Sequence, residues 1–379
     1  MNPVITNKAD LYFERGGPAD RLLQRLGLIP RCALLTALTW LPLLVLSAVQ
    51  GQALGPTPRL SCLLDFATYA RFFVAIPALL AAEVVIGPRL RMAALLFVDA
   101  NLVRPQDYPL FERAIEQVKR CREAVLPEII MLGIALVGPW TLTVEHWYGG
   151  SVTWHTGHSL AALWYHVVAI PILQFLILRC LWRLIIWIRF LYAMTRIDLD
   201  IVGTHADGAG GLGFLGTAHG SFGIFGFAIS SVVCADAAFQ IVFEGAKVQN
   251  FEIPFAALLI LMEVVMLGPL LVFMPLLVRK SREWRRRYRI LVAEYNRAFD
   301  QKWVIGPRPA DEKLLGSADI QSLADLGNNF DRVRGMRTIP FSQRVVIQLA
   351  VVTALPALPL LPLILPVADI LKTLAKVVF

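Results

Sequence analysis

Four ionisable side chains lie inside long apolar stretches of the chain, where such groups are rare. They are Glu83, His166, Asp236 and Glu263. A carboxylate near the centre of a bilayer costs about 2.5 to 3.5 kcal/mol on insertion scales, so these groups are expected to face a bundle interior or water. They predict a path along which cations or protons are bound and released. The alternative is that they are neutral, hydrogen-bonded between helices, or close to a headgroup region.

A glycine-rich segment, residues 203–214, is a second candidate site. Its candidate binding residues are His205, Asp207, Gly208, Gly210, Gly211 and Gly213. The backbone amides of such a turn can point inward at the positive end of the following helix, which would bind a phosphate headgroup, a carboxylate or another anion. The alternative is a tight turn packed against neighbouring helices. Dinucleotide binding is not predicted, because that glycine spacing needs a preceding strand and a parallel sheet.

Two further clusters carry titratable groups. Seven basic residues follow the sixth apolar stretch: Arg279, Lys280, Arg282, Arg285, Arg286, Arg287 and Arg289. We interpret them as an orientation signal that also binds anionic lipid headgroups. Three histidines, His146, His155 and His158, are weak candidates for zinc or copper. Their aromatic surroundings favour a membrane-interface belt instead, so neither a metal nor another cofactor is predicted.

The composition requires these groups to be positioned by membrane helices. The chain of 379 residues is 57% hydrophobic and 17% charged, too apolar for a soluble protein of this size. We predict an all-α fold, a polytopic transmembrane helix bundle with a helical cytoplasmic layer. The seven expected spans are 32–49, 71–87, 127–144, 160–178, 221–243, 253–278 and 345–365.

The distribution of positive charge predicts the orientation of these spans. Of the 36 Lys and Arg residues, 31 lie in the N-terminal 31 residues and in segments 88–126, 179–220 and 279–344. Because cytoplasmic segments carry the excess of positive charge, we expect the N-terminus in the cytoplasm and the chain in a bacterial inner membrane. Lipid headgroups account for this charge, so nucleic acid is not expected as a partner.

The predicted organisation follows from these spans. It comprises a cytoplasmic N-terminal segment (1–31), spans 1 and 2 (32–87), a cytoplasmic amphipathic helical segment (88–126), spans 3 and 4 with a basic inner extension (127–196), a cytoplasmic glycine-rich loop (197–220), spans 5 and 6 (221–278), a basic cytoplasmic helix with a polar segment (279–344), and a proline-rich span 7 with a C-terminal interfacial helix (345–379). Residues 82–88 are similar to residues 262–269, which indicates either an internal repeat or chance likeness between apolar helices.

Two polar segments carry a resemblance to known proteins. They are His-Ala-Asp-Gly-Ala-Gly-Gly-Leu-Gly-Phe-Leu at 205–215 and Ser-Ala-Asp-Ile-Gln-Ser-Leu-Ala-Asp-Leu-Gly-Asn at 317–328. Both are similar to segments of a group of uncharacterised bacterial multi-spanning inner-membrane proteins. The resemblance implies a membrane location but no activity.

These features favour a transport protein, channel-like or carrier-like and homo-oligomeric. One alternative is a membrane-anchored sensor or scaffold that binds a cytoplasmic protein. A weaker alternative is an intramembrane enzyme that acts on lipid. The chain has none of the serine-elbow, zinc-protease or Walker motifs, so enzyme activity is not favoured.

Overall fold

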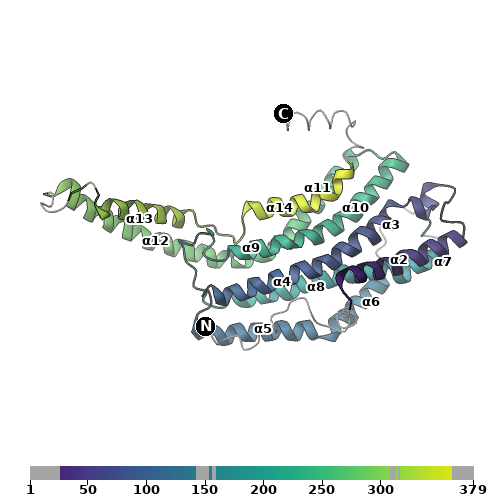
Figure 1. The fold of residues 1–379 in the computed structure, drawn as a ribbon, viewed down its shortest axis with the longest axis horizontal. Helices are drawn as coiled ribbons and strands as arrows, with labels where there is room; N and C mark the ends of the chain where they lie inside the picture. Colours follow the sequence, from purple (N-terminus) through teal and green to yellow (C-terminus); the bar gives the residue numbers. More distant parts are fainter. Residues whose placement is uncertain (1–25, 142–152, 156–158, 308–312, 315, 361–379) are drawn as a thin grey trace.

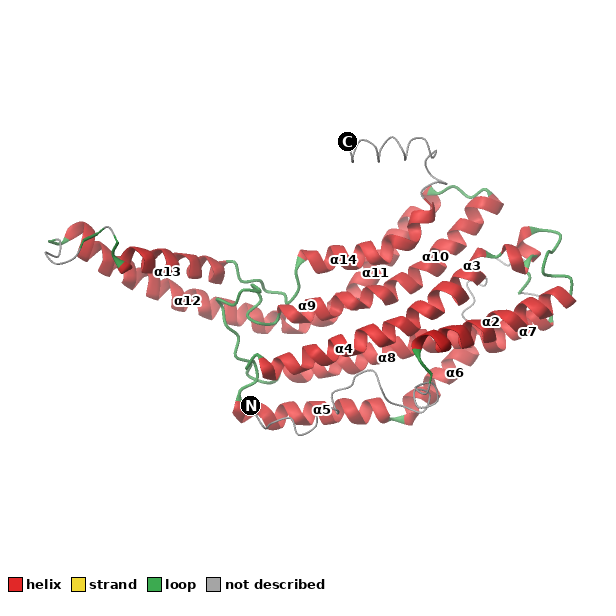
Figure 2. Ribbon diagram, viewed as in Figure 1, coloured by secondary structure: helices red, strands yellow, loops and turns green. Residues whose placement is uncertain are grey.

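The computed structural model describes residues 26–141, 153–155, 159–307, 313–314 and 316–360. Within these ranges the regular elements are helices, and no strand occurs among them (Figure 2). The all-α prediction is therefore confirmed. The predicted C-terminal interfacial helix and most of the predicted N-terminal segment lie outside the described residues.

Several helices are joined end to end by a 3₁₀ or π-helical turn. Their bounds are α2 (Leu28–Val49), α3 (Phe66–Tyr69), a π turn (Ala70–Ala75), α4 (Ile76–Asp99), α5 (Tyr108–Glu123), α6 (Val125–Thr141), α7 (Leu160–Trp164), a π turn (Tyr165–Ala169), α8 (Ile170–Met194), α9 (Gly213–His219), a 3₁₀ turn (Gly220–Phe222), α10 (Gly223–Glu244), α11 (Gln249–Leu267), a 3₁₀ segment (Gly268–Phe273), α12 (Met274–Phe299), a π turn (Asp300–Ile305), α13 (Ala318–Arg334), α14 (Gln343–Ala354) and a 3₁₀ segment (Leu355–Leu360).

Among the described residues, six helical stretches are long and apolar enough to cross a membrane. They are Leu28–Val49, Phe66–Asp99, Leu160–Met194, Gly213–Glu244, Gln249–Ile305 and Gln343–Leu360. Six of the seven predicted spans are thereby confirmed, and the chain is a multi-pass membrane protein. The remaining predicted span, the third (127–144), corresponds to α6, an apolar helix of 17 residues, and the end of that predicted span lies outside the described residues.

A helical hairpin formed by α12 and α13 projects from one end of the bundle (Figure 1). We call this the hairpin end; it also holds the connections 100–107 and 195–212. The opposite end holds the connections 50–65 and 245–248. The sixth span continues directly into the basic helix that follows it, since 249–305 is one helical stretch of 57 residues. At 1.5 Å per residue it is about 85 Å long.

The bundle extends beyond a bilayer at the hairpin end. The stretches 66–99 and 160–194 have 34 and 35 residues, whereas about 20 suffice to cross hydrocarbon. Their surplus forms a protruding layer in which the Phe97 ring contacts the rings of Phe190, Phe214 and Phe273. The amphipathic helix expected within residues 88–126 is α5, and it buries its apolar face against α8 in this layer.

Glycines allow α9 and α10 to approach α14 closely. A Cβ atom at Gly216 would lie 2.8 Å from the Cβ of Phe341, and one at Gly226 would lie 2.4 Å from the hydroxyl of Thr353. Both distances are shorter than a van der Waals contact. A side chain at Gly216 would push α9 away from the linker just before α14, and one at Gly226 would separate α10 from α14. Small residues perform this role in many membrane helix pairs.

Candidate functional site

The most buried charged group among the predicted residues is Glu83 of α4, which pairs with two arginines of α8. Its Oε1 atom lies 3.3 Å from Nε of Arg179 and 3.1 Å from a guanidinium nitrogen of Arg183. The exposed fractions of the three side chains are 10%, 4% and 13%. Because Arg179 and Arg183 are one helical turn apart, both reach the same carboxylate from one face of α8.

Sequence reasoning identified Glu83 but missed its partners. The predicted fourth span ended at Leu178, so Arg179 and Arg183 were assigned to a basic extension of that span. The structure instead continues α8 without interruption to Met194. The signal that was available is the four-residue spacing of the two arginines within a largely apolar helical stretch.

Glu263 of α11 has a different environment from Glu83. Both of its carboxylate oxygens are inaccessible to solvent, and neither has a hydrogen-bond partner among the described residues. Its neighbours Ile260, Leu261 and Val264 have exposed fractions of 64%, 53% and 61%, so they face lipid in a membrane. Glu263 therefore lies at the edge of the packed face of α11, with its carboxyl group turned inward.

A histidine that sequence reasoning overlooked joins three helices beside Glu263. Trp187 of α8 donates from Nε1 to Nε2 of His219 at 2.8 Å, and Nδ1 of His219 lies 2.6 Å from the Met266 carbonyl. An indole N–H can only donate and a carbonyl can only accept, so the neutral ring carries its proton on Nδ1. His219 is fully buried. The sequence offered no signal for His219, because a single histidine near a glycine-rich loop does not indicate a particular structural or functional role.

The proline after α11 explains why the Met266 carbonyl needs this partner. The segment Gly268–Phe273 is a 3₁₀ helix, in which the donor to a carbonyl is the amide three residues later. For Met266 that residue is Pro269, which has no N–H. The ring of His219 supplies the missing donor, which fixes α9 against the end of α11.

Asp236 and His166 lie toward the opposite end of the bundle, away from Glu83. Asp236 is exposed on α10 and accepts a hydrogen bond of 2.9 Å from Gln240, one turn later. Nε2 of His166 lies 2.9 Å from the carbonyl of His155. Of the four predicted path residues, the structure therefore brings no pair into contact with each other.

Asp65 is a second residue that sequence reasoning missed, and it organises the opposite end. Its carboxylate accepts hydrogen bonds from the amides of Ala67 and Thr68 at the start of α3 and from the indole of Trp154. Burial disfavours the charged form, but the nearby Arg71 charge, the hydrogen bonds from the Thr68 hydroxyl and the Trp154 indole, and the His155 ring outweigh it and lower the pKa of Asp65. The arrangement is an N-cap that also anchors the connection containing Trp154.

The histidine-rich segment shows no metal site in its described part. His155 stacks on Tyr165, with ring centroids 5.0 Å apart, as expected for an aromatic belt. His146 and His158 lie outside the described residues. Across the described ranges no group of three or more potential metal ligands occurs.

The glycine-rich loop binds a carboxylate from the chain itself. Asp207 accepts hydrogen bonds from the amides of Ala209, Gly211 and Gly213 at 2.8, 3.1 and 2.7 Å. Gly208, Gly210 and Gly211 have positive φ angles of 62°, 67° and 99°, which let the chain curl around this carboxylate. The amides predicted to bind an external anion are thus occupied by Asp207, and the predicted anion site is corrected to an internal one.

Neighbouring groups stabilise the loop. Burial opposes ionisation of Asp207, but the three amides and the adjacent His205 ring more than compensate and lower its pKa. His205 Nδ1 lies 2.9 Å from the carboxylate. The backbone amide of Arg337 donates to the Gly208 carbonyl at 2.7 Å, and its guanidinium donates to the Asp207 carbonyl. The loop therefore joins the segment before α9 to the linker between α13 and α14.

The seven basic residues of α12 divide into two groups. Lys280 lies 3.5 Å from Asp198, Arg285 donates to the Arg334 carbonyl, and Arg287 pairs with Glu283. The other four are exposed, and no ion pair is found for them within the described ranges: Arg279, Arg282, Arg286 and Arg289. If about 20 residues from Gln249 onward cross the hydrocarbon, Arg289 lies roughly 30 Å beyond the end of the membrane-crossing part. Lipid binding stays a prediction, and it fits Arg279, the first of the four along α12, better than Arg289.

An apolar layer separates the polar groups of the two ends. Between Arg71 and Glu83 the helix contributes Phe72, Ala75, Ile76, Leu79 and Leu80, each at most 1% exposed. The 12 residues from Arg71 to Glu83 correspond to about 18 Å along the helix. Any path through this part of the bundle therefore needs a rearrangement of α4 against its neighbours.

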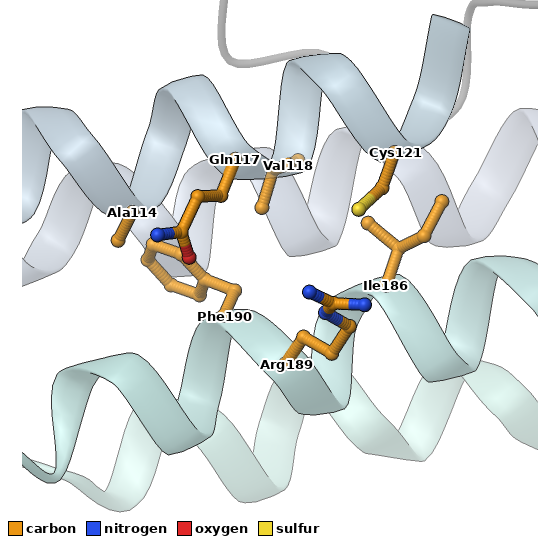
Figure 3. Close-up of a pocket in the computed structure, with 7 residues that line it drawn as sticks. All are labelled: Ala114, Gln117, Val118, Cys121, Ile186, Arg189 and Phe190. Carbon is orange, nitrogen blue, oxygen red and sulfur yellow. The ribbon is translucent and has the colours of Figure 1, made fainter. Parts of the chain in front are cut away.

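A small pocket lies between α5 and α8 in the protruding layer (Figure 3). It is lined by Ala114, Gln117, Val118, Cys121, Ile186, Arg189 and Phe190. None of the predicted site residues contributes to it. It is therefore a feature of the α5 packing and separate from the intramembrane carboxylates.

The fold and these groups define a multi-pass helical membrane protein with an ion pair buried between two spans. Comparison with protein-family models, curated proteins and solved structures found no match to this chain.

Proposed function

We propose that this chain is an ion transport protein in which Glu83, Arg179 and Arg183 form the polar site of the path. The observation that carries the proposal is the burial of these three charges between α4 and α8. Removing charges from water is expensive, and a well-packed apolar contact stabilises a helix pair at least as well. A site that binds a charged solute, in contrast, needs charges that can exchange partners.

The same proposal includes the orientation and location expected from the sequence. The hairpin end carries most of the positive charge, so we assign it to the cytoplasm and the protein to a bacterial inner membrane. The apolar layer between Arg71 and Glu83 would then separate the polar site from the outer side. A homo-oligomer is proposed as well, since α2 and α14 leave most of their apolar surface uncovered.

Ion flux through the full-length protein in liposomes tests this proposal. With a potassium chloride gradient, we expect flux from the native protein and a decrease of roughly tenfold for Glu83→Gln, equivalent to about 1.4 kcal/mol. Glu112→Gln, which changes an exposed carboxylate of α5, is the matched control and should leave the flux unchanged. Unchanged flux in Glu83→Gln would remove the proposed site, and absence of flux from the native protein would reject ion transport.

A scaffold or sensor is the second candidate, and the α12–α13 hairpin favours it. The hairpin projects beyond the bundle and exposes Ile290, Leu291, Val304 and Ile305, with exposed fractions between 47% and 74%. Exposed aliphatic residues next to arginines are typical of protein-binding surfaces. Two results together would support this candidate. The native protein would show no ion flux, and a cytoplasmic protein would co-purify with it but not with the Ile290→Ser and Val304→Ser variants.

A further inference from the structure

Glu263 is the one carboxylate of the predicted path for which the described residues provide no partner. Its two oxygens are both solvent-inaccessible and both without a hydrogen bond there. Asp236 has Gln240, and Glu83 has two guanidinium groups within 3.3 Å. An ionised carboxylate in this position would have neither water nor a counter-charge.

The elements that pack against α11 do not supply a counter-charge. Their titratable groups are His219 on α9, Cys234, Asp236 and Glu244 on α10, and Arg344 on α14. None of these forms a hydrogen bond or ion pair with Glu263 among the described contacts. Among these groups, His219 contacts α11 close to Glu263, since it binds the carbonyl of Met266, three residues after Glu263. Both of its ring nitrogens are already engaged, so it can neither donate to nor protonate Glu263.

The depth of Glu263 excludes easy hydration. It is 14 residues from the start of α11 at Gln249, or about 21 Å along the helix. It is also one turn before the His219–Met266 contact, on the membrane side of the protruding layer. Its flanking residues Leu261 and Val264 face outward to lipid. A group at this depth is surrounded by apolar atoms on both the protein and the lipid side.

We infer that Glu263 is an intramembrane proton-binding site, held as the neutral acid at neutral pH. The physical reason is that an isolated carboxylate in an apolar medium is so unfavourable that the group takes up a proton instead. A neutral carboxyl group needs no counter-charge, which fits the observed surroundings. Its ligand is therefore a proton, and release of that proton requires a movement of α11 that admits water or a cation. The role of this proton in driving ion transport rests on the proposed function; the protonation itself does not.

Infrared spectroscopy of the full-length protein in lipid tests the inference directly. A protonated carboxyl group has a C=O stretch that is separate from that of an ionised carboxylate and that shifts in deuterium oxide. At pH 7 we expect the C=O band of a protonated carboxyl group in the spectrum of the native protein and not in that of Glu263→Gln. In the same comparison for Glu83→Gln, we expect the variant to lose a band of an ionised carboxylate instead. If Glu263→Gln removes an ionised band, or both variants give the same difference, the inference is overturned.

Flux measurements separate this inference from the proposed function. A pH gradient imposed on the liposomes should alter ion flux through the native protein severalfold, and Glu263→Gln should abolish that dependence. A protonated band without any ion flux would leave the proton site standing and reject the transport proposal. Flux that keeps its full pH dependence in Glu263→Gln would instead reject the coupling role of this proton.

Discussion

The segments around Glu83 in α4 and Glu263 in α11 have similar sequences but opposite environments. Each segment contains the sequence Glu-Val-Val, and a Gly-Pro pair follows within six residues of the glutamate. Glu83 faces Arg179 and Arg183 of α8, whereas the described neighbours of Glu263 offer it no partner. The difference shows that the partners of an intramembrane carboxylate depend on the helix opposite it, since the local sequence is nearly the same.

The Gly-Pro pairs also behave differently in the two segments. Pro88 is accommodated within α4, which continues as an α-helix to Asp99. At Pro269 the helix changes to 3₁₀ geometry, and His219 binds the carbonyl that the proline leaves without a donor. One extra residue, Leu267, separates glutamate from proline in α11. Whether the two segments descend from an internal repeat stays a prediction.

The largest expected effect comes from Glu83→Leu. This variant leaves two arginines buried without their carboxylate, and breaking a buried ion pair typically costs about 3 to 5 kcal/mol. We expect a marked fall in the thermal unfolding temperature of the protein in detergent. A triple variant that also replaces Arg179 by Leu and Arg183 by Leu should recover part of the loss, because it removes the two charges that Glu83 had paired with. A loss below about 1 kcal/mol would mean that Glu83 is not an essential counter-charge.

A smaller loss is expected for His219→Phe, which keeps an aromatic ring beside the α11 segment but removes both hydrogen bonds. The Trp187 indole and the Met266 carbonyl would each lose the hydrogen bond to His219, at about 1 to 3 kcal/mol per group. Thermal unfolding in detergent measures the change. Adding Pro269→Ala should restore part of the stability, because alanine supplies the N–H that proline lacks. If this second change has no effect, the explanation of the 3₁₀ segment is wrong.

Asp207 extends the comparison to a carboxylate that is held by backbone amides outside the membrane spans. Asp207→Asn should destabilise the protein by about 1 to 3 kcal/mol at neutral pH, since the amides lose a charged acceptor. The folded pKa of Asp207 lies below its ordinary value of 3.8, so its contribution is present above that pH and is lost as the pH falls through the folded pKa. Unfolding measured from pH 7 down to pH 3 should therefore show a smaller acid-induced loss in Asp207→Asn than in the native protein.

The sequence predicted the membrane helices well because hydrophobic length is a local property. It located Glu83 and Glu263 for the same reason. It could not reveal Arg179 and Arg183 as partners of Glu83, since that pairing depends on how α4 and α8 pack. The glycine-rich loop illustrates the same limit: the sequence indicated amides arranged around an anion, but only the fold identifies that anion as Asp207.

The smallest effect on stability is expected for Glu263→Gln. If Glu263 is a neutral acid, glutamine replaces one neutral polar group of similar size by another, and the change should stay below about 1 kcal/mol in thermal unfolding. Glu83→Gln is the matched comparison, because there the same substitution removes a charge that two arginines require, at a cost of several kcal/mol. Two glutamates with nearly the same local sequence should thus respond very differently to one chemical change. A large loss in Glu263→Gln would mean that Glu263 is ionised and paired, and the contrast between α4 and α11 would fail.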